Sequence, residues 1–442
     1  MFDWLKMSAA KLGQGIGEGA IDPVALTQAF LGAIDSHEHR DKIYSQVTHD
    51  RAMAEAEAAA ERARAGQRLS ALDGVPISWK DLFDSAGTVT EAGSALLKGR
   101  VPNKDAKVLE NATKLGLVCL GKTHMSELAF SGLGFNPVTA TPPCVNDAGA
   151  VPGGSSSGAA SSVAFDLAAV GIGSDTGGSV RIPAAWNDLV GLKTTWGRIQ
   201  SDGVVPLCPR FDTVGPICRT VEDAALSLAI LEGGAVPDLQ GASLKGMQFA
   251  ILETSAMESV RDEPLKAFET AVQRIKDAGG HVTKITAPEV ARAMSMSAVL
   301  FTSEAYGVWQ EEIESNPDVM FAEILARFRS GAQFSGPQYV AAWRELKALR
   351  ERWNQRVAGF DAVICPTAPI LPPNLARLQH DKEYYVEENL LALRNTRIGN
   401  LMGLCGITLP TGVPSCGLML FGQPFQEERL LRIAAAAERV LT

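Results

Sequence analysis

Two turns rich in glycine and serine frame an apolar stretch of this chain and restrict how its central part can fold. The first turn covers residues 152–158 and the second residues 173–183, with a helix candidate and a strand candidate between them. Successive backbone N–H groups in glycine-rich turns form a nest that holds an anion, although the spacing fits ordinary turns equally well. A serine at the end of such a nest has its hydroxyl beside the donors that acyl transfer needs. The predicted oxyanion hole consists of Thr176, Gly177, Gly178 and Ser179.

Helix and strand patterns alternate along most of the chain. The expected helices span residues 50–66, 106–115, 157–165, 264–278 and 338–358, and the expected strands span 75–79, 117–120, 168–172, 249–252, 362–365 and 417–421. Alternation of this kind is typical of βα units around a central sheet. No repeat or linker divides the chain. We therefore predict an α/β fold and one domain over residues 1–442, with a helical N-terminal segment at about 1–68.

The composition is that of an ordinary globular protein, with 46% hydrophobic and 21% charged residues. The formal net charge of -9 argues against a nucleic-acid partner, because phosphate binding depends on clustered lysine and arginine. Seven cysteines without a C-x-x-C pair suggest reduced thiols. The N-terminal residues lack the pattern of a signal peptide, and no apolar run is long enough to span a membrane. We expect a cytoplasmic protein that contacts neither a membrane nor a nucleic acid.

Three motifs occur in the order and spacing of the amidase signature family, which this chain resembles most strongly over about residues 70–225. The family joins a strand-end lysine, a G-G-S-S-[GS]-G turn and a G-[ST]-D-[TI]-G-G-S-[IV]-R-x-P-A block. Lys80 stands at the end of the strand expected over 75–79, and Ser155 and Ser179 occupy the two serine positions, 24 residues apart as in the family. The resemblance continues through 191–198 and 211–216 and more weakly into the tail.

The resemblance implies a mixed central β-sheet covered by α-helices on both faces. It also implies amide hydrolysis without a metal or an organic cofactor, in which Lys80 is the base, Ser155 relays protons and Ser179 forms an acyl-enzyme. A lysine acts as a base only when it is neutral near the working pH, so the family buries it. The Gly154–Ser155 peptide bond is expected to be cis, as in the family.

Some positions depart from the family pattern without removing a catalytic group. Trp186, Asn187 and Asp188 follow the P-A-A triplet, where the family often has other residues, and Thr194 replaces a frequent proline. Asp175 and Arg181 match the family, and we interpret both as structural charges that fix the backbone of the nest.

Rival motifs are present but lack the context that their chemistry needs. Residues 116–123 match the phosphate-loop expression, yet their central residues are apolar and are expected to form a buried strand. Residues 154–158 match G-x-S-x-G with Ser156 central, but no histidine lies in the context of an α/β-hydrolase. The S-x-x-K at 8–11 and the H-x-H at 37–39 are expected at the surface. No base lies near Cys144 in the sequence.

The segment before the first serine turn predicts an apolar substrate pocket. It has no arginine or lysine between residues 125 and 150, so we expect a small uncharged amide or anilide, with residues 366–373 and 380–400 supplying a wall or lid. Arg394 and Arg397 in the second of these stretches would reverse this preference if either side chain reached the pocket. Apolar pocket candidates include Phe135, Pro137, Pro142 and Pro143, and the predicted substrate-binding residues are Phe130, Ser131, Leu133, Ser156 and Trp186.

Other functions on the same scaffold stay open at the level of the sequence. One is a glutaminase subunit of a tRNA-dependent amidotransferase, since such subunits share the signature, and another is a carbamate or ester hydrolase. A non-catalytic binding protein is disfavoured because Lys80, Ser155 and Ser179 are all intact. The expected partner is a small-molecule amide, and a homodimer is left open.

Overall fold

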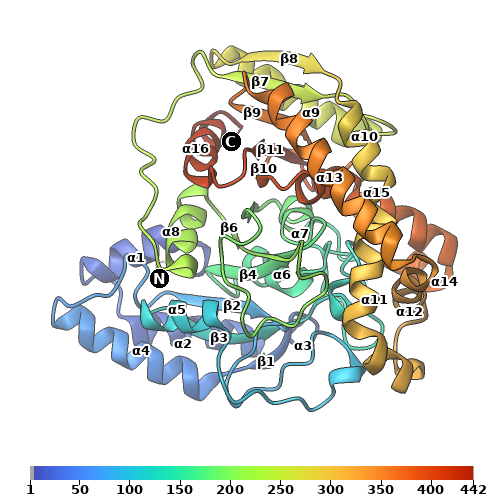
Figure 1. Ribbon diagram of the computed structural model, residues 1–442. Coiled ribbons are helices and arrows are strands. Elements are labelled where there is room, and N and C mark those ends of the chain that lie inside the picture. Colours follow the sequence, from blue (N-terminus) through green and yellow to red (C-terminus); the bar gives the residue numbers. More distant parts are fainter. Residues whose placement is uncertain (1–3, 442) are drawn as a thin grey trace.

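The alternating strands form one mixed sheet of 11 strands in a computed structural model that describes residues 4–441. Its order is β1-β3-β2-β4-β6-β5-β10-β11-β9-β7-β8, running from the bottom to the top of Figure 1. The strands are β1 (Tyr44–Val47), β2 (Pro76–Lys80), β3 (Val118–Thr123), β4 (Val170–Asp175), β5 (Val190–Lys193), β6 (Thr213–Cys218), β7 (Gln248–Leu252), β8 (His281–Ile285), β9 (Ala362–Pro366), β10 (Cys405–Pro410) and β11 (Gly417–Gly422). The predicted α/β fold with a mixed sheet is confirmed.

Helices cover both faces of this sheet. α6 and α7 contact each other on one face, with α15 packed on α7, while α16 contacts both α8 and α9 on the other face. The helices are α1 (Ala9–Gly17), α2 (Pro23–Ser36), α3 (Arg40–Ile43), α4 (His49–Arg64), α5 (Lys107–Lys114), α6 (Ser157–Ala164), α7 (Arg181–Trp186), α8 (Val221–Glu232), α9 (Asp262–Asp277), α10 (Pro288–Ser295), α11 (Ser297–Ser315), α12 (Ala322–Arg329), α13 (Gly336–Val357), α14 (Leu375–His380), α15 (Lys382–Leu401) and α16 (Glu427–Leu441).

The register of three parallel strands brings two of the motifs together. β2 lies between β3 and β4 and pairs in parallel with both, and Trp79 of β2 lies opposite Ile172 of β4. Lys80, one residue further on, therefore reaches the edge of the sheet where β4 ends at Asp175. Ligand sites of α/β sheets form at the carboxyl ends of parallel strands, and the two serine turns lie at this edge.

The phosphate-loop match is a buried strand, as its apolar centre predicts. Residues 118–123 form β3, and every residue in it is buried. The Nζ atom of Lys122 lies 3.3 Å from Asp81 Oδ1 and donates a 2.9 Å hydrogen bond to Thr90 Oγ1. Because the strand backbone is paired and buried on both sides, its N–H groups are not open to a phosphate.

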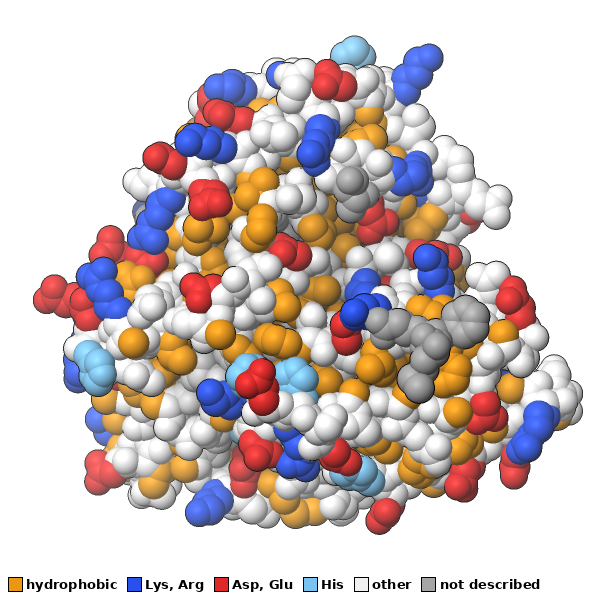
Figure 2. Space-filling view, turned by 180° about the vertical axis from the view of Figure 1, so that it is seen from behind, with side chains coloured by type: hydrophobic (Ala, Val, Ile, Leu, Met, Phe, Trp, Pro, Cys, Tyr) orange, Lys and Arg blue, Asp and Glu red, His pale blue; other side chains and the backbone are white. Residues whose placement is uncertain are grey.

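The surface carries charges of both signs. On the face in Figure 2, lysine and arginine side chains are interspersed with aspartate and glutamate, without a large area of one sign. All seven cysteines are free and buried. None of the helices within residues 4–441 has the length and apolar character that crossing a membrane requires.

Candidate active site

Lys80 occupies the last position of β2, and its side chain is fully buried. Its Nζ atom donates hydrogen bonds to Ser155 Oγ at 2.7 Å and to Ser174 Oγ at 2.8 Å. Both partners are neutral hydroxyls. A neutral amine has two N–H groups and one lone pair, and a hydroxyl can donate as well as accept, so this environment suits an uncharged lysine whose lone pair accepts from one of the two serines.

Burial is the main influence on the charge of Lys80. Removal from water lowers the pKa of Lys80 to about 7, and the negative charges of Asp175 and Asp212 oppose the shift only partly. A lysine with this pKa is about half deprotonated at neutral pH, which is the condition for general-base catalysis.

The first serine turn lies against both Lys80 and the second turn. The Gly154–Ser155 peptide bond is cis, which confirms the expectation. The Ser156 N–H donates to the Ser179 carbonyl oxygen at 3.2 Å, so the backbones of the two turns are joined directly. The Ser156 hydroxyl donates to the Ser174 carbonyl oxygen and accepts from the Ser174 N–H, so Ser156 braces β4.

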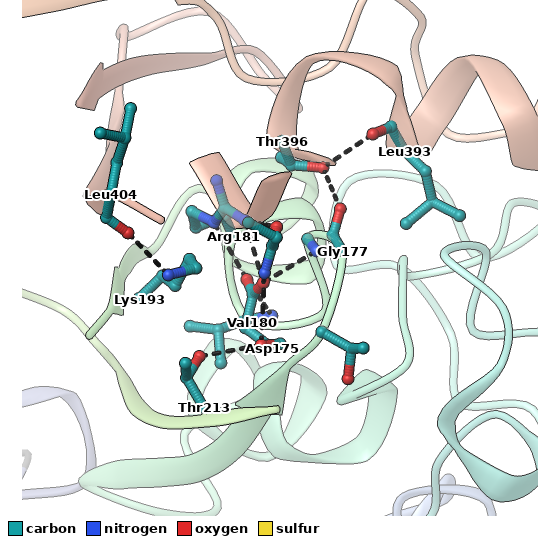
Figure 3. Close-up of polar contacts among 12 residues, drawn as sticks. Asp175, Gly177, Val180, Arg181, Lys193, Thr213, Leu393, Thr396 and Leu404 are labelled. Carbon is teal, nitrogen blue, oxygen red and sulfur yellow. Dashed lines mark hydrogen bonds and ion pairs between the residues drawn. The ribbon is translucent and has the colours of Figure 1, made fainter. Parts of the chain in front are cut away.

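A buried ion pair holds the second turn. The carboxylate of Asp175 accepts hydrogen bonds from the Gly178 N–H at 2.8 Å and the Val180 N–H at 3.2 Å, and it pairs with Arg181 at 2.9 Å (Figure 3). Asn400 of α15 binds both members of the pair. Burial disfavours the charged carboxylate, but the Arg181 charge and these hydrogen bonds lower the pKa of Asp175 to about 2. These contacts support the structural interpretation of both residues.

These hydrogen bonds change the set of N–H donors expected for the oxyanion hole. The Gly178 N–H is committed to Asp175, which removes it from the expected donors. Within residues 4–441 the N–H groups of Thr176, Gly177 and Ser179 have no acceptor, so three of the four predicted donors stay available. Only glycine fits at position 178, because its φ is +141° and a Cβ there would lie 2.1 Å from Thr396 Oγ1. Thr396 in turn donates to the Gly177 carbonyl oxygen at 2.8 Å, as Figure 3 shows.

The Asp175→Asn variant should lose about 3 to 5 kcal/mol of unfolding free energy, because it leaves the Arg181 charge buried without a counter-charge. Denaturant unfolding at pH 7 to 8 measures this difference. The matched control is Glu110→Gln, which breaks exposed helix pairs with Lys107 and Lys114 and should change the unfolding free energy far less. Equal losses in the two variants would contradict the structural role of Asp175.

A narrow cavity of about 30 Å³ lies against the nest and Ser179. It shares Phe301, Arg327 and Arg397 with a larger cavity of about 500 Å³ between α11, α12 and α15. The narrow cavity is lined by Ala129, Phe130, Ser131, Thr176, Gly177, Ser179, Leu207, Phe301, Arg327, Leu393 and Arg397. Residues 380–400 therefore supply a wall of the site, in the form of a helix.

Two of the five predicted substrate-binding residues, Phe130 and Ser131, line this cavity. Leu133, Ser156 and Trp186 are not among the lining residues. Leu133 and Trp186 belong to a separate buried apolar cluster, and the Trp186 indole N–H donates to the Ile370 carbonyl oxygen. Packing and backbone bracing occupy these three side chains outside this cavity, and their role in substrate binding stays a prediction.

Several residues of the site were not found by sequence reasoning. Ser174 is the second hydrogen-bond acceptor of Lys80, and the alternation of side chains along a strand ending at Asp175 would have indicated it. Asp212 accepts a 2.5 Å hydrogen bond from Thr176 Oγ1 behind the nest. Arg327 is on α12, in a stretch without any motif, and no local pattern indicates it.

The mixed sheet, with a polar site at the ends of parallel strands, defines an α/β enzyme. The sequence pattern of the amidase family matches residues 25–431. The chain is 34% identical over 391 residues to the 2-amino-5-chloromuconic acid deaminase of Comamonas testosteroni, covering 85% of this chain and 83% of that protein. It is 32% identical over 471 residues to the A subunit of the glutamyl-tRNA(Gln) amidotransferase of Brucella anthropi, covering 95% of this chain and 94% of that subunit.

A solved structure agrees with these relatives. The fold matches that of the native peptide amidase from Stenotrophomonas maltophilia with a TM-score of 0.83 and 26% identity, covering 98% of this chain and 96% of that one. The chain belongs to the amidase family, and it is a hydrolase of carbon–nitrogen amide bonds.

Proposed function

We propose that the protein is an amidohydrolase in which Ser179 is the nucleophile, Ser155 relays protons and Lys80 is the base. The observation that carries this proposal is the buried amine of Lys80, held on Ser155 at 2.7 Å beside a turn whose free N–H groups flank Ser179. Neutral lysine, a bridging hydroxyl and an anion-binding nest are the three parts that serine acylation requires without histidine.

The reaction begins when Ser179 Oγ attacks the amide carbonyl carbon. Its proton passes to Ser155, and the Ser155 proton passes to the lone pair of Lys80. The N–H groups of Thr176, Gly177 and Ser179 bind the oxygen that becomes negative. The carbon–nitrogen bond then breaks, and the amine leaves with a proton returned from Lys80 through Ser155. Water hydrolyses the acyl-enzyme by the same relay in reverse.

Treatment with a fluorophosphonate should phosphonylate Ser179 alone, because only this serine adjoins the nest that stabilises an attacked phosphorus centre. Peptide mass mapping identifies the modified residue, and Ser179→Ala is the matched negative control. An adduct on Ser155 or Ser156 with Ser179 unmodified would contradict the assignment.

A second candidate is the glutaminase component of an amidotransferase, because the chain is similar to one subunit of such an assembly over 95% of its length. In this case glutamine would be the only good substrate, and a partner would co-purify with the protein. A panel of amides with varied acyl and amine halves, extended to esters and carbamates, separates the two candidates.

A further inference from the structure

Two arginines enter the cavity beside Ser179 from helices that are distant in sequence. Arg327 on α12 and Arg397 on α15 line both the narrow and the large cavity, at the place where the two meet. Arg327 donates a 2.9 Å hydrogen bond to the Phe130 carbonyl oxygen, and its guanidinium lies over the Phe130 ring. Arg397 is only 8% exposed, and its Nη2 atom is buried without a hydrogen-bond partner.

Neither arginine has a counter-charge within residues 4–441. No aspartate or glutamate forms an ion pair with them, and the carboxylate of the same cavity, Glu323, is held by Lys382 at 3.3 Å. Burial lowers the pKa of Arg327, and burial together with the Arg327 charge lowers the pKa of Arg397 to about 9. A guanidinium keeps its proton inside proteins, so both groups are cations at neutral pH. Two uncompensated charges are costly in a cavity unless a ligand supplies an anion.

Two more polar side chains of the large cavity have unused donors. The Tyr385 hydroxyl is buried beside Ser131, and it donates to no protein acceptor in the described part of the chain. The Asn389 carbonyl oxygen accepts from Ser131 and from the Gly132 N–H, and its NH₂ group donates to no protein acceptor among residues 4–441. A donor-rich and acceptor-poor cavity is complementary to a carboxylate.

We propose that Arg327 and Arg397 bind a carboxylate of the substrate, so that the enzyme acts on small amides that carry a carboxylate. This inference rests on the proposed function, because it takes Ser179 as the point of attack. The arginines and the nest share one narrow cavity, which requires a short spacer between the carboxylate and the scissile amide. The absence of cations in residues 125–150 led us to expect an uncharged substrate. The proposed site instead favours an anionic substrate, because Arg327 and Arg397 enter it from α12 and α15.

The first test compares charged and neutral amides of the same shape on the wild-type enzyme. Monoamides of short dicarboxylic acids, from malonic to adipic, are matched with keto-amides in which a methyl ketone replaces the carboxylate. A second matched set, N-acylglycines and the corresponding N-acyl aminoketones, places the carboxylate in the amine half. At least one charged member should exceed its neutral counterpart in kcat/KM by about 100-fold or more. A neutral preference in every pair overturns the inference.

Binding to the Ser179→Ala protein separates this inference from the proposed function. Calorimetric titration of the same pairs measures affinity without turnover. Tighter binding of a charged member than of its neutral counterpart supports the carboxylate site, even if the wild-type enzyme does not cleave that compound. Failure of cleavage would count against the proposed reaction alone. If neutral amides are cleaved and neither kcat/KM nor affinity favours a charged member, the proposed hydrolase activity is supported and the carboxylate site is overturned.

Arg394 provides a matched control on the same helix. Its side chain donates to the Ala256 carbonyl oxygen and to Asn395, and it is not among the residues that line either cavity. Arg397→Met and Arg327→Met should each reduce the charged-to-neutral preference by about 30-fold or more, whereas Arg394→Met should not change it. Arg397→Lys should restore part of the preference, because it returns the charge without the planar fork. An unchanged preference in both methionine variants, with melting temperatures near wild type, overturns the assignment.

Discussion

Ser179→Ala is expected to lower kcat by about 10⁴- to 10⁶-fold, because the residue that forms the acyl-enzyme has no substitute in the site. Ser179 adjoins three N–H groups without acceptors, whereas the hydroxyl of Ser156 is bonded to the backbone of Ser174. Steady-state kinetics on any amide that the wild-type enzyme cleaves gives this ratio, and circular dichroism confirms that the variant is folded.

Neighbouring serines provide the controls for this prediction. Ser155→Ala should lose about 10² to 10⁴ in kcat, because only the relay between Lys80 and Ser179 is removed. Ser156→Ala should lose less activity and more stability, since the Ser156 hydroxyl forms hydrogen bonds with the Ser174 backbone in β4. A Ser179→Ala loss smaller than that of Ser156→Ala would remove the nucleophile assignment.

Lys80→Arg should lower kcat/KM by about 10² to 10⁴, because a guanidinium stays protonated at every working pH and cannot accept a proton. The wild-type enzyme should show kcat/KM rising with pH through a limb near 7, the pKa that burial sets for Lys80. The sign follows from the role of the group: the base is active when deprotonated, so activity is lost as the pH falls below this value.

A pH profile of kcat/KM tests the assignment of that limb. The small residual activity of Lys80→Met should show no such rise near pH 7, while Lys193→Met provides a buried lysine that contacts the Thr194 and Leu404 carbonyl oxygens instead of the serine turns. Lys193→Met should keep the limb. A limb that persists in Lys80→Met would assign it to another group.

Sequence reasoning singles out Lys80, Ser155 and Ser179, the proposed reacting residues, because they lie in short, local motifs. Ser155 and Ser179 lie in turns whose glycines leave little conformational choice, and Lys80 ends a strand that a preceding turn delimits. The spacing of these motifs along the chain therefore indicates that the three residues come together. Helices such as α4 and α9 were also predictable, because their apolar positions recur at helical period.

Features that depend on distant contacts could not be predicted in the same way. Arg327 and Arg397 meet only because α12 and α15 pack on the same cavity, and no local pattern records that contact. The strand β6 contains Pro216, which argues against a central strand, yet it lies between β4 and β5. Its pairing with β5 is limited to Val190 with Cys218 and Gly191 with Ile217, so that the ladder stops beside the proline.

The buried amine that we propose as the base also weakens the fold. In the unfolded chain Lys80 binds its proton up to about pH 10.5, whereas in the folded protein it releases the proton near pH 7. Between these values the unfolded state binds more protons, so the contribution of Lys80 to stability improves as the pH rises and is most unfavourable below pH 7. Each unit of this difference corresponds to about 1.4 kcal/mol. An apolar side chain of similar length at position 80 would therefore be expected to stabilise the folded protein while removing the proposed base.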